Sequence, residues 1–583
     1  MISHVFDLPK FINDKYSGGI VFSGKKAGEW LKYSAKDYTE NADAISHALL
    51  KLGIQKNDAV VTLSNNRPEW NFTDIGIMQI GAVHVPVYPT ISDKELTYIL
   101  NEIDVKVVFV SNNFLFQKVN KIRYSLPSLK EIISYDNVDG ALSYINFLDS
   151  GRSENSDLET HKSAIDPKDL ATIIYTSGTT SKPKGVMLSH TNLVSNFMAA
   201  APTLNMSPGF VSLSYLPLCH VYERMINYMH QYLGFPVYYA ESLAGITSNF
   251  KEVRPNVVST VPLLLEKIYA GILAKGNQLK GIKKSIFLLS VKKAENHEIN
   301  MPRNLFSNML HRFLDKKVYA IWREALGGNM QRFICGGAAL QHKYLRFFWN
   351  AGIPVHEGYG LTETSPLLTV NHYSKVREDS VGQAIDGVEL KIAADGEILC
   401  RTPGLMQGYF QKKSLTDEVI NQEGWFHTGD TGMLDQEGFL FITGRKKDLF
   451  KTSAGVYISP DHVEGKLRLS PYISQAIVVG ANKSFLSVLL VPDYENTLQY
   501  VKSNHEIEAV QLKELILNPE VIRLFQTEID KYNQDILESE KIEKFVLMEG
   551  EWTIENNEIT PSLKTRREFI IQKYKKQIED FYV

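Results

Sequence analysis

Short apolar runs rich in β-branched and aromatic residues alternate with segments of helical periodicity over the first two thirds of the chain. Six runs predict strands, at residues 59–63, 82–88, 105–110, 171–175, 211–216 and 257–261. Strands that alternate with helices favour parallel pairing, because a parallel connection needs a crossover of a dozen or more residues. The pattern therefore predicts a large N-terminal part built of open α/β sheets.

The pattern changes near residue 385. Residues 387–410 and 438–444 are dense in glycine and turn dipeptides, which predicts a small antiparallel β subdomain over about 385–444. After Gly444, two β-like runs flank the turn "ANKS", and residues 499–544 are mainly helical by period. We therefore expect a second, smaller α+β domain over residues 445–583. The region 275–304, rich in Lys and Asn, is expected to be a surface insertion.

Length, charge and cysteine content narrow the class of protein. The 583 residues exceed what one core usually supports, which agrees with two or more domains. A formal net charge of −3 gives no general reason to bind nucleic acid. Three widely separated cysteines predict neither disulfides nor a zinc site and favour the cytoplasm. No run approaches the ~18 apolar residues of a membrane span, so peripheral contact is the most membrane association we expect.

A loop rich in hydroxyl groups follows the predicted strand at 171–175. The string "YTSGTTSKPKGV" is not a Walker A loop, because Gly178 and Gly185 stand seven positions apart and Pro183 interrupts the approach. Its hydroxyls, backbone N–H groups and lysines can still hold phosphates. On composition alone, a solvated turn before a helix starting near His190 explains the string equally well.

The same string resembles the phosphate-binding signature of the adenylate-forming superfamily, which includes acyl-CoA synthetases, luciferases and peptide-synthetase adenylation domains. Six further strings resemble family motifs in the family's order: "LPLCHVYER" at 216–224, "ICGGAAL" at 334–340, "HEGYGLTET" at 356–364, "GWFHTGD" at 424–430, "GRKKDLFK" at 444–451 and "TPSLKTRR" at 560–567. The chain is identified as a member of this superfamily over about residues 20–575. The resemblance implies an AMP-binding domain over 1–444 and a mobile C-terminal lid over 445–583.

The resemblance also implies a nucleotide site. The β- and γ-phosphates would lie against Thr176, Ser177, Gly178, Thr179, Thr180 and Lys184. The adenine slot would be lined by Gly336, Gly337, Ala338, Glu357, Gly358 and Tyr359, with Tyr359 stacked on the ring. Asp430 and Arg445 would bind the ribose hydroxyls. A buried structural tyrosine and a turn-forming aspartate are the alternatives for Tyr359 and Asp430.

Three residues would carry the first reaction step. By resemblance, Thr362 reaches the α-phosphate and Glu363 ligates Mg²⁺, for which an oxygen donor is suitable. Lys564 would bridge the carboxylate and the α-phosphate, although a lysine in a basic tail is ordinarily a solvated charge. Lys447 aligns with the pivot about which the lid turns between the two steps.

Two positions depart from the family pattern downstream of the pivot. Ala454 stands where the family usually has glycine, and Val456 stands where it has a basic residue. The first change adds a methyl group near the expected pantetheine passage, and the second removes a phosphate contact. We therefore expect adenylation more firmly than thioester formation.

The acid is suggested by residues 221–232. Tyr222, Met225, Met229 and Tyr232 fall on one face at helical spacing, which suits a flexible alkyl chain, although core packing explains the same spacing. By resemblance, His220 gates the acyl pocket beside Tyr222 and Met225. The strings "HVYER" and "VPLLLEKIY" and the insertion after residue 272 look most like long-chain fatty acyl-CoA synthetases.

The expected reaction is therefore a two-step ligation. Fatty acid and MgATP would give acyl-AMP and pyrophosphate, and CoA would then give acyl-CoA and AMP. An acyl-AMP ligase that serves a carrier protein, or a binding protein that has lost the chemistry, remain open alternatives. Monomer and homodimer are both compatible with the sequence.

Overall fold

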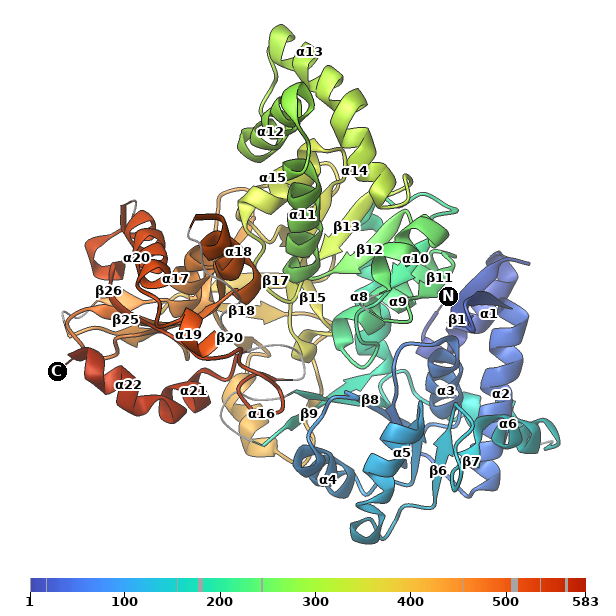
Figure 1. Ribbon diagram of the computed structural model, residues 1–583. Coiled ribbons are helices and arrows are strands. Elements are labelled where there is room, and N and C mark those ends of the chain that lie inside the picture. Colours follow the sequence, from blue (N-terminus) through green and yellow to red (C-terminus); the bar gives the residue numbers. More distant parts are fainter. Residues whose placement is uncertain are drawn as a thin grey trace.

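The computed structural model describes residues 2–16, 18–154, 156–176, 182–242, 245–453, 456–504, 512–534, 536–560 and 565–582. Figure 1 shows two large α/β sheets, a small antiparallel sheet and a C-terminal α+β domain. The predicted mixed α/β architecture is confirmed. In the described part of the chain, each helix is too short or too polar to cross a bilayer.

One large sheet has eight strands within the described residues. Their order is β19 (Gly408–Tyr409), β9 (Lys184–Ser189), β8 (Leu170–Thr176), β4 (Val83–Val87), β3 (Ala59–Leu63), β5 (Val107–Val110), β6 (Glu131–Ser134) and β7 (Leu142–Ser143). Strands β8, β4, β3, β5, β6 and β7 pair in parallel, whereas β9 and β19 are antiparallel additions. Every residue of β3 and β4 is buried, as expected for apolar strands covered on both faces.

Helices precede or connect the parallel strands of this sheet. They are α2 (Ala35–Lys51), α3 (Pro68–Met78), α4 (Asp93–Glu102), α5 (Asn113–Asn120), α6 (Tyr144–Arg152) and α7 (Leu158–Ser163). Helix α4 begins at the Ser92 N-cap, whose hydroxyl accepts from the backbone N–H of Glu95. This places the first turn of α4 close to the end of β4, at the carboxyl edge where sites form in open α/β sheets.

Where the chain is described, the second large sheet has nine strands. Their order is β16 (Gln383–Ala384), β15 (Leu367–Val370), β14 (Val355–Gly360), β13 (Arg332–Cys335), β12 (Val257–Thr260), β10 (Ser212–Ser214), β11 (Val237–Tyr239), β1 (Ile20–Lys26) and β2 (Glu29–Ser34). Its helices include α1 (Leu8–Lys15), α8 (His190–Ala200), α9 (Val221–Tyr232), α10 (Ile246–Val253), α11 (Pro262–Asn277) and α15 (His342–Asn350). All six predicted strands are present, most of them shorter than expected.

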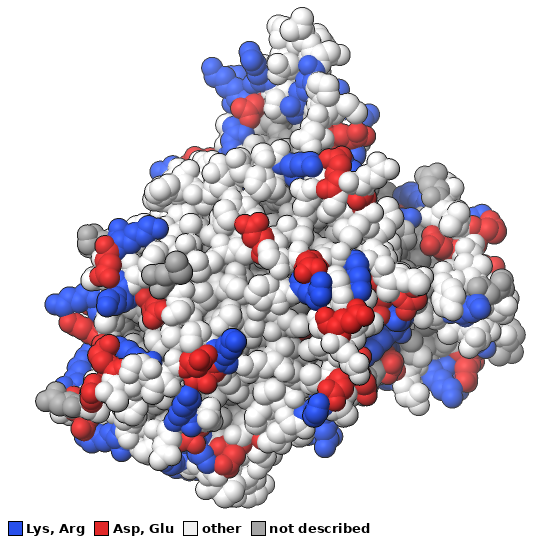
Figure 2. Space-filling model, turned by 180° about the vertical axis from the view of Figure 1, so that it is seen from behind, with Lys and Arg blue, Asp and Glu red and all other residues white. Residues whose placement is uncertain are grey.

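A helical lobe projects from this sheet at the top of Figure 1. It contains α12 (Gly281–Asn296), α13 (Leu305–Leu314), a π-helical segment (Asp315–Tyr319) and α14 (Ala320–Ala325). The expected surface insertion at 275–304 therefore forms α12 and the segment that leads to α13. Seen from behind, the outermost tip of the lobe is largely free of charged side chains, and Lys and Arg flank it below (Figure 2).

The small sheet forms where the turn-rich segment predicted it. Its strands β17 (Glu389–Ile392), β18 (Glu397–Arg401), β20 (Phe426–Leu434) and β21 (Leu440–Arg445) are antiparallel, and α16 (Lys413–Val419) lies beside them. Between β18 and α16, strand β19 leaves this sheet and pairs with β9 instead. That excursion brings Tyr409 to the hairpin of β8 and β9.

The C-terminal domain packs helices on a short sheet. Strands β24 (Ile473–Val479) and β25 (Leu486–Pro492) form the predicted hairpin, and β22 (Phe450–Lys451) pairs with β23 (Tyr457–Ile458). The helices are α17 (Pro460–Leu467), α18 (Tyr494–Asn504), α19 (Leu512–Leu515), α20 (Pro519–Gln534), α21 (Arg567–Lys573) and α22 (Lys575–Glu579). The helical prediction for 499–544 was wrong at its end, because Ile542 begins β26 (Ile542–Leu547), which pairs in parallel with β25.

Candidate nucleotide and acyl site

The predicted phosphate loop is the tip of the hairpin formed by β8 and β9. Thr176 lies opposite Lys184, and its Oγ1 donates a hydrogen bond to the Lys184 carbonyl oxygen at 3.4 Å. The other predicted loop residues, Ser177, Gly178, Thr179 and Thr180, lie outside the described residues. The described base of the hairpin thus carries one hydroxyl and one amine of the predicted set.

Tyr409 connects the hairpin to the predicted metal ligand. The Lys184 Nζ lies 5.0 Å from the centre of the Tyr409 ring, a cation–π distance. The Tyr409 hydroxyl donates a hydrogen bond to Glu363 Oε1 at 2.9 Å. Burial, followed by the charge of Glu363, raises the pKa of Tyr409, so its phenol remains a donor at neutral pH. The sequence provided no reason to assign Tyr409 a role, because its partners Lys184 and Glu363 are far from it in the sequence.

The pKa of Lys184 reflects both its burial and a second lysine. Burial lowers the pKa of Lys184, and repulsion from Lys447 lowers it further. Lys447, the predicted pivot, therefore acts electrostatically on Lys184. An anion bound between the two amines would relieve this repulsion, so the arrangement favours an anionic ligand.

A short 3₁₀ turn, η5 (Thr362–Thr364), positions Thr362 and Glu363 directly after β14. The carbonyl oxygen of Glu363 accepts from the backbone N–H of Met406 at 2.8 Å. At Gly360, a Cβ atom would lie 1.8 Å from the Pro366 carbonyl oxygen, so only glycine fits where β14 enters the turn. The Gly-Leu-Thr-Glu string is thereby explained by backbone packing as well as by chemistry.

Three predicted nucleotide residues from distant segments meet at one carboxylate. The Tyr359 hydroxyl donates to Asp430 Oδ2 at 2.7 Å, and Arg445 Nε lies 3.0 Å from Asp430 Oδ1. Asp430 and Arg445 are cross-strand partners on β20 and β21. The Asp430 carboxylate is buried, with only 3% of the residue exposed. A carboxylate offers about four acceptor positions, so one such group can serve several donors at once.

The predicted adenine slot lies between β13 and β14. A Cβ atom at Gly336 would lie 3.4 Å from the Tyr222 ring and 3.6 Å from the Gly358 carbonyl oxygen, which are ordinary van der Waals distances. Gly337 has a φ of +83°, which favours glycine. Burial raises the pKa of Glu357 to about 8, and within the described residues its Oε2 has no hydrogen-bond partner. Ala338 follows in the same bend after β13.

The predicted acyl residues lie at the start of α9. His220 is the N-cap, and its Nδ1 accepts from the backbone N–H of Tyr222 at 3.1 Å. The Tyr222 hydroxyl donates to the Ile334 carbonyl oxygen at 2.7 Å, which ties α9 to β13. Met225 and Met229 are buried. Because α9 is buried on nearly every face, core packing accounts for the methionine spacing, and the acyl role of these residues stays a prediction.

A buried charge network in α9 escaped the sequence analysis. Asp74 of α3 accepts from Arg224 Nη2, from Tyr228 and from His84, each at 2.5 Å. Burial opposes ionisation of Asp74, but Arg224 and His84 hold its pKa below the ordinary value. The signal was present in the "HVYER" string, where Glu223 and Arg224 are charged within a segment otherwise rich in apolar and aromatic residues. The network fixes α9 against the eight-stranded sheet.

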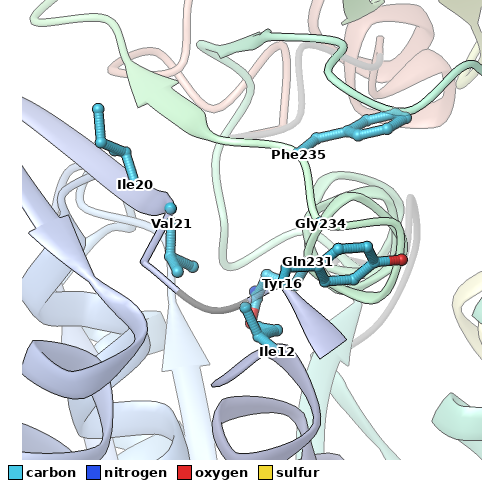
Figure 3. Close-up of a pocket in the computed structure, with 8 residues that line it drawn as sticks. Ile12, Tyr16, Ile20, Val21, Gln231, Gly234 and Phe235 are labelled. Carbon is cyan, nitrogen blue, oxygen red and sulfur yellow. The ribbon is translucent and has the colours of Figure 1, made fainter. Parts of the chain in front are cut away.

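Figure 3 shows a cavity at the other end of α9. It lies between α1, β1 and the turn after α9, and its lining includes Ile12, Tyr16, Gln231 and Phe235. The Gln231 Nε2 has no partner in the described part of the chain, and the Oε1 accepts from Tyr38 at 3.1 Å. The cavity is separate from the predicted nucleotide residues, none of which lines it.

Helix α4 contacts both the hairpin and the end of the chain. Arg566 Nη2 lies 2.8 Å from Glu95 Oε1, and Lys182 Nζ lies 5.2 Å from the centre of the Tyr98 ring. Glu95 and Tyr98 are neighbours on one face of α4, since residues three apart lie one above the other on a helix. Lys564 and Ala454 lie outside the described residues, whereas Val456 is exposed on the C-terminal domain.

Family comparisons identify the chain. Residues 14–410 match the AMP-binding enzyme family, and residues 447–583 match the C-terminal domain of AMP-binding enzymes. The chain belongs to the AMP-binding enzyme family. The superfamily identification made from the motifs is confirmed. This AMP-binding enzyme is an adenylate-forming protein of the acyl-CoA ligase family.

Curated relatives of this AMP-binding enzyme extend over nearly its whole length. A long-chain-fatty-acid–CoA ligase of Mycobacterium bovis is 32% identical over 569 residues, which are 95% of this chain and 93% of the relative. A human long-chain-fatty-acid–CoA ligase is 30% identical over 617 residues, which cover 99% of this chain and 92% of the relative.

Solved structures of other AMP-binding enzymes share the fold. ATP-bound MatB from Rhodopseudomonas palustris is 20% identical, covers 100% of both chains and has a TM-score of 0.71. The adenylation domain of a carboxylate reductase from Mycobacterium chelonae is 19% identical, covers 99% of this chain and 91% of that chain, and has a TM-score of 0.78. At this identity the likeness concerns the fold and leaves the acid substrate open.

Proposed function

We propose that this AMP-binding enzyme is a long-chain fatty acid–CoA ligase. It would join a fatty acid to ATP, giving acyl-AMP and pyrophosphate, and then transfer the acyl group to CoA with release of AMP. The observation that carries the proposal is the convergence on α4: Lys182 beside the hairpin and Arg566 beside Lys564 contact the same helix face. The names of the curated relatives support the long-chain acid.

In the first step, a carboxylate oxygen attacks the α-phosphorus and the bond to pyrophosphate breaks. The carboxylate is already ionised at neutral pH, so no general base is required. Lys564 precedes Arg566 by two positions, and the Arg566–Glu95 ion pair would hold that segment near the hairpin. The amine of Lys564 would then stabilise the charge that develops at the transferring phosphorus. Lys184 and Thr176 would hold the leaving phosphates.

The residues present fit a magnesium ion bound together with the nucleotide. Glu363 is half-buried, and Tyr409 orients its carboxylate. Among the described residues, no group of three His, Cys, Asp or Glu could hold a metal. Mg²⁺ commonly uses one or two carboxylates together with substrate phosphates, so one glutamate suits it. When bound, the ion would neutralise phosphate charge, and Glu363 would be its protein ligand.

The ribose and adenine contacts would come from the cluster at Asp430. Asp430 would accept the ribose hydroxyls while Arg445 holds the carboxylate in place. The Tyr359 ring is held by its own hydrogen bond to Asp430, so the adenine base would stack against a fixed surface. Gly336, Gly337 and Ala338 would leave room for the flat base on its other side.

In the second step, the lid would turn about Lys447 and withdraw Lys564. Among the described residues, the contacts that would break include Arg566 with Glu95 and Gln341 Nε2, which donates to the Gly465 carbonyl oxygen at 3.1 Å. The thiol of CoA would then attack the acyl carbonyl, and AMP would leave. His220 and Tyr222, at the N-terminus of α9, would line the entrance to the acyl pocket.

A carrier protein is the second candidate acceptor. The exposed Val456 occupies a lid position where the family has a basic residue. Without that basic residue, the lid lacks a charge that the phosphates of free CoA would use. A carrier protein presents pantetheine without the nucleotide of CoA, so it depends less on such a contact. The acceptor therefore needs its own measurement.

The test is a pyrophosphate-exchange assay with saturated acids from octanoate to stearate, followed by AMP release with CoA or with a holo carrier protein. We expect exchange to rise with chain length and AMP release to require CoA. AMP release with the carrier alone would indicate the acyl-AMP ligase. Absence of exchange with every acid would indicate a binding protein that has lost the chemistry.

A further inference from the structure

The lobe at the top of the molecule exposes an unusual number of large apolar side chains. On α13, Leu305 is 87% exposed, Phe306 79%, Met309 71% and Phe313 46%. Near them, the chain exposes Ile282, Leu288, Leu289, Met301 and Ile321. Figure 1 places α13 at the outermost point of the lobe, and Figure 2 shows that this tip carries little charge. Such a concentration marks an interaction surface.

The apolar residues of α13 form one stripe that points to solvent. Leu305, Met309 and Phe313 follow each other at intervals of four, and Phe306 lies beside them, so the four span an arc of about 100° at 3.6 residues per turn. The buried Leu314 lies on the opposite, inward side. Helix α13 is therefore amphipathic with its apolar face outward, the reverse of a helix that packs on a core.

Positive charge surrounds this stripe. Between residues 275 and 323 the sequence has eleven Lys or Arg and three Asp or Glu, whereas the whole chain has 63 and 66. On α12, Lys283 precedes Lys284, and Lys316 and Lys317 follow α13. The nearly neutral chain thus concentrates its basic residues beside its most exposed apolar ones.

A basic cavity lies between α12 and α13. Lys293, Asn296 and His297 line it from the end of α12, and Arg303, Ser307 and His311 line it from α13 and the preceding turn, with Leu310 and Leu314. Burial, followed by the charge of Arg303, lowers the pKa of both His297 and His311. The cavity therefore has the donors and the positive potential that a phosphate group requires.

We propose that the α12–α13 lobe docks on a bilayer that contains anionic phospholipid. The apolar stripe of α13 enters the boundary between headgroups and acyl chains, and the surrounding lysines face the lipid phosphates. The basic cavity beneath α13 receives one such phosphate. A second copy of this chain fits less well, because two lobes placed face to face would bring like charges together. The inference concerns a surface outside the nucleotide site and does not depend on the proposed ligase activity.

The test is co-sedimentation of the full chain with large unilamellar vesicles of phosphatidylcholine alone or of phosphatidylcholine with phosphatidylglycerol. We expect binding to the anionic vesicles and at least about tenfold weaker binding to the neutral ones. Phe306→Ser/Met309→Ser and Lys283→Glu/Lys284→Glu should each weaken binding about tenfold. Raising the salt concentration should weaken the wild type more than the lysine variant, because screening removes the electrostatic part.

Matched variants control for exposure and charge elsewhere. Phe114→Ser removes a phenylalanine that is 72% exposed on α5, and Lys575→Glu/Lys576→Glu reverses two lysines on α22. Both should bind vesicles like the wild type. All variants lie outside the nucleotide site, so pyrophosphate exchange with a soluble octanoate substrate reports that each one is folded, and thermal unfolding reports this even if the protein has no ligase activity.

Three outcomes would overturn the proposal. Equal binding to neutral and anionic vesicles would remove the electrostatic argument. Equal loss of binding in the α5 or α22 variants would indicate that the docking surface lies outside the lobe. A dimer that Phe306→Ser/Met309→Ser converts to a monomer in analytical ultracentrifugation, without vesicle binding by the wild type, would assign the stripe to self-association.

Discussion

Single side chains in this protein connect segments that are far apart in sequence. Tyr409 is the clearest case, since its ring contacts Lys184 and its hydroxyl holds Glu363. A phenol is suited to both contacts, because its face attracts a cation and its hydroxyl donates to a carboxylate. At the residue scale, the site is therefore organised by groups that would contact no substrate themselves.

Tyr409→Phe should impair adenylation while keeping the ring beside Lys184. The variant loses a hydrogen bond to a charged group, for which roughly 1.5–3 kcal/mol is typical, so kcat for pyrophosphate exchange should fall roughly 10- to 100-fold. The magnesium concentration required for half-maximal rate should rise. Tyr135→Phe, which removes a buried hydroxyl that donates to Thr73 at 2.8 Å, serves as the control. Similar rates in the two variants would contradict the positioning role.

Glu223→Gln should change how stability depends on pH. Burial raises the pKa of Glu223 from 4.5 to about 7, although the hydrogen bonds that Ser214 and Ser259 donate to its carboxylate act in the opposite direction and lower the pKa. The folded state therefore favours the neutral acid, and its contribution to stability is complete below pH 4.5 and is lost as pH rises through 7.

The measurement is urea unfolding of wild type and Glu223→Gln from pH 5 to pH 8. We expect the variant to gain about 3 kcal/mol relative to the wild type over the full titration, because one pKa unit corresponds to about 1.4 kcal/mol. Glu357 titrates in both proteins, so its effect cancels. A constant difference across the pH range would show that Glu223 does not titrate there.

At the scale of elements, α9 is the part whose position matters most. Its N-terminus carries His220 and Tyr222, and its middle carries the network of Arg224 and Tyr228 with Asp74 of α3. The network joins α9 to the eight-stranded sheet, whereas Tyr222 joins it to β13 of the other sheet. Helix α9 thus sets the relative position of the phosphate hairpin and the predicted adenine slot.

Asp74→Asn should destabilise the N-terminal domain. Removal of one partner from a buried ion pair leaves Arg224 uncompensated, which typically costs about 3–5 kcal/mol. Asp149→Asn, whose carboxylate forms an exposed ion pair with Arg152 at 2.9 Å, should change stability by less than about 1 kcal/mol. The measurement is the denaturant midpoint of the first unfolding transition, compared between the wild type and the two variants. Equal midpoints would mean that Asp74 does not anchor α9.

At the scale of the whole molecule, the proposed reaction depends on how the lid meets the N-terminal domain. Arg566 reaches Glu95 from the lid, and Gln341 reaches the lid from the N-terminal domain. We expect the two arrangements of the domains to be similar in free energy, as a reversible rotation requires. The lid would therefore be free to leave once the adenylate has formed.

Lys564→Ala should separate the two half-reactions. The variant should lose fatty-acid-dependent pyrophosphate exchange by at least about 100-fold, since the proposed amine would no longer stabilise the charge of the transition state. It should still form thioester from supplied acyl-adenylate and CoA at nearly the wild-type rate. Lys576→Ala, in α22, should leave both steps unchanged. Equal loss of both steps in Lys564→Ala would contradict the alternating lid.

Patterns within short segments of the sequence predicted the strands and helices well. They predicted poorly which strands and side chains lie next to each other. The runs at 59–63 and 257–261 form β3 and β12 almost as expected, because burial on both faces selects continuous β-branched residues. The end of the predicted helical stretch at 542–544 failed, since pairing with β25 outweighed local preference. Of the candidate site, Tyr359, Asp430 and Arg445 come together as a cluster, whereas Tyr409 and Asp74 carried no local signal.

By itself, the sequence determined the fold class, the family and the order of the motifs. These are properties of short segments, in which spacing and residue type act over a few neighbours. The tertiary structure decided which segments meet: β19 beside β9, Asp74 against Arg224, and both the hairpin and the chain end on α4. It also decided that α13 turns its apolar face outward, because amphipathic periodicity fixes a stripe but only packing fixes the direction in which that stripe points.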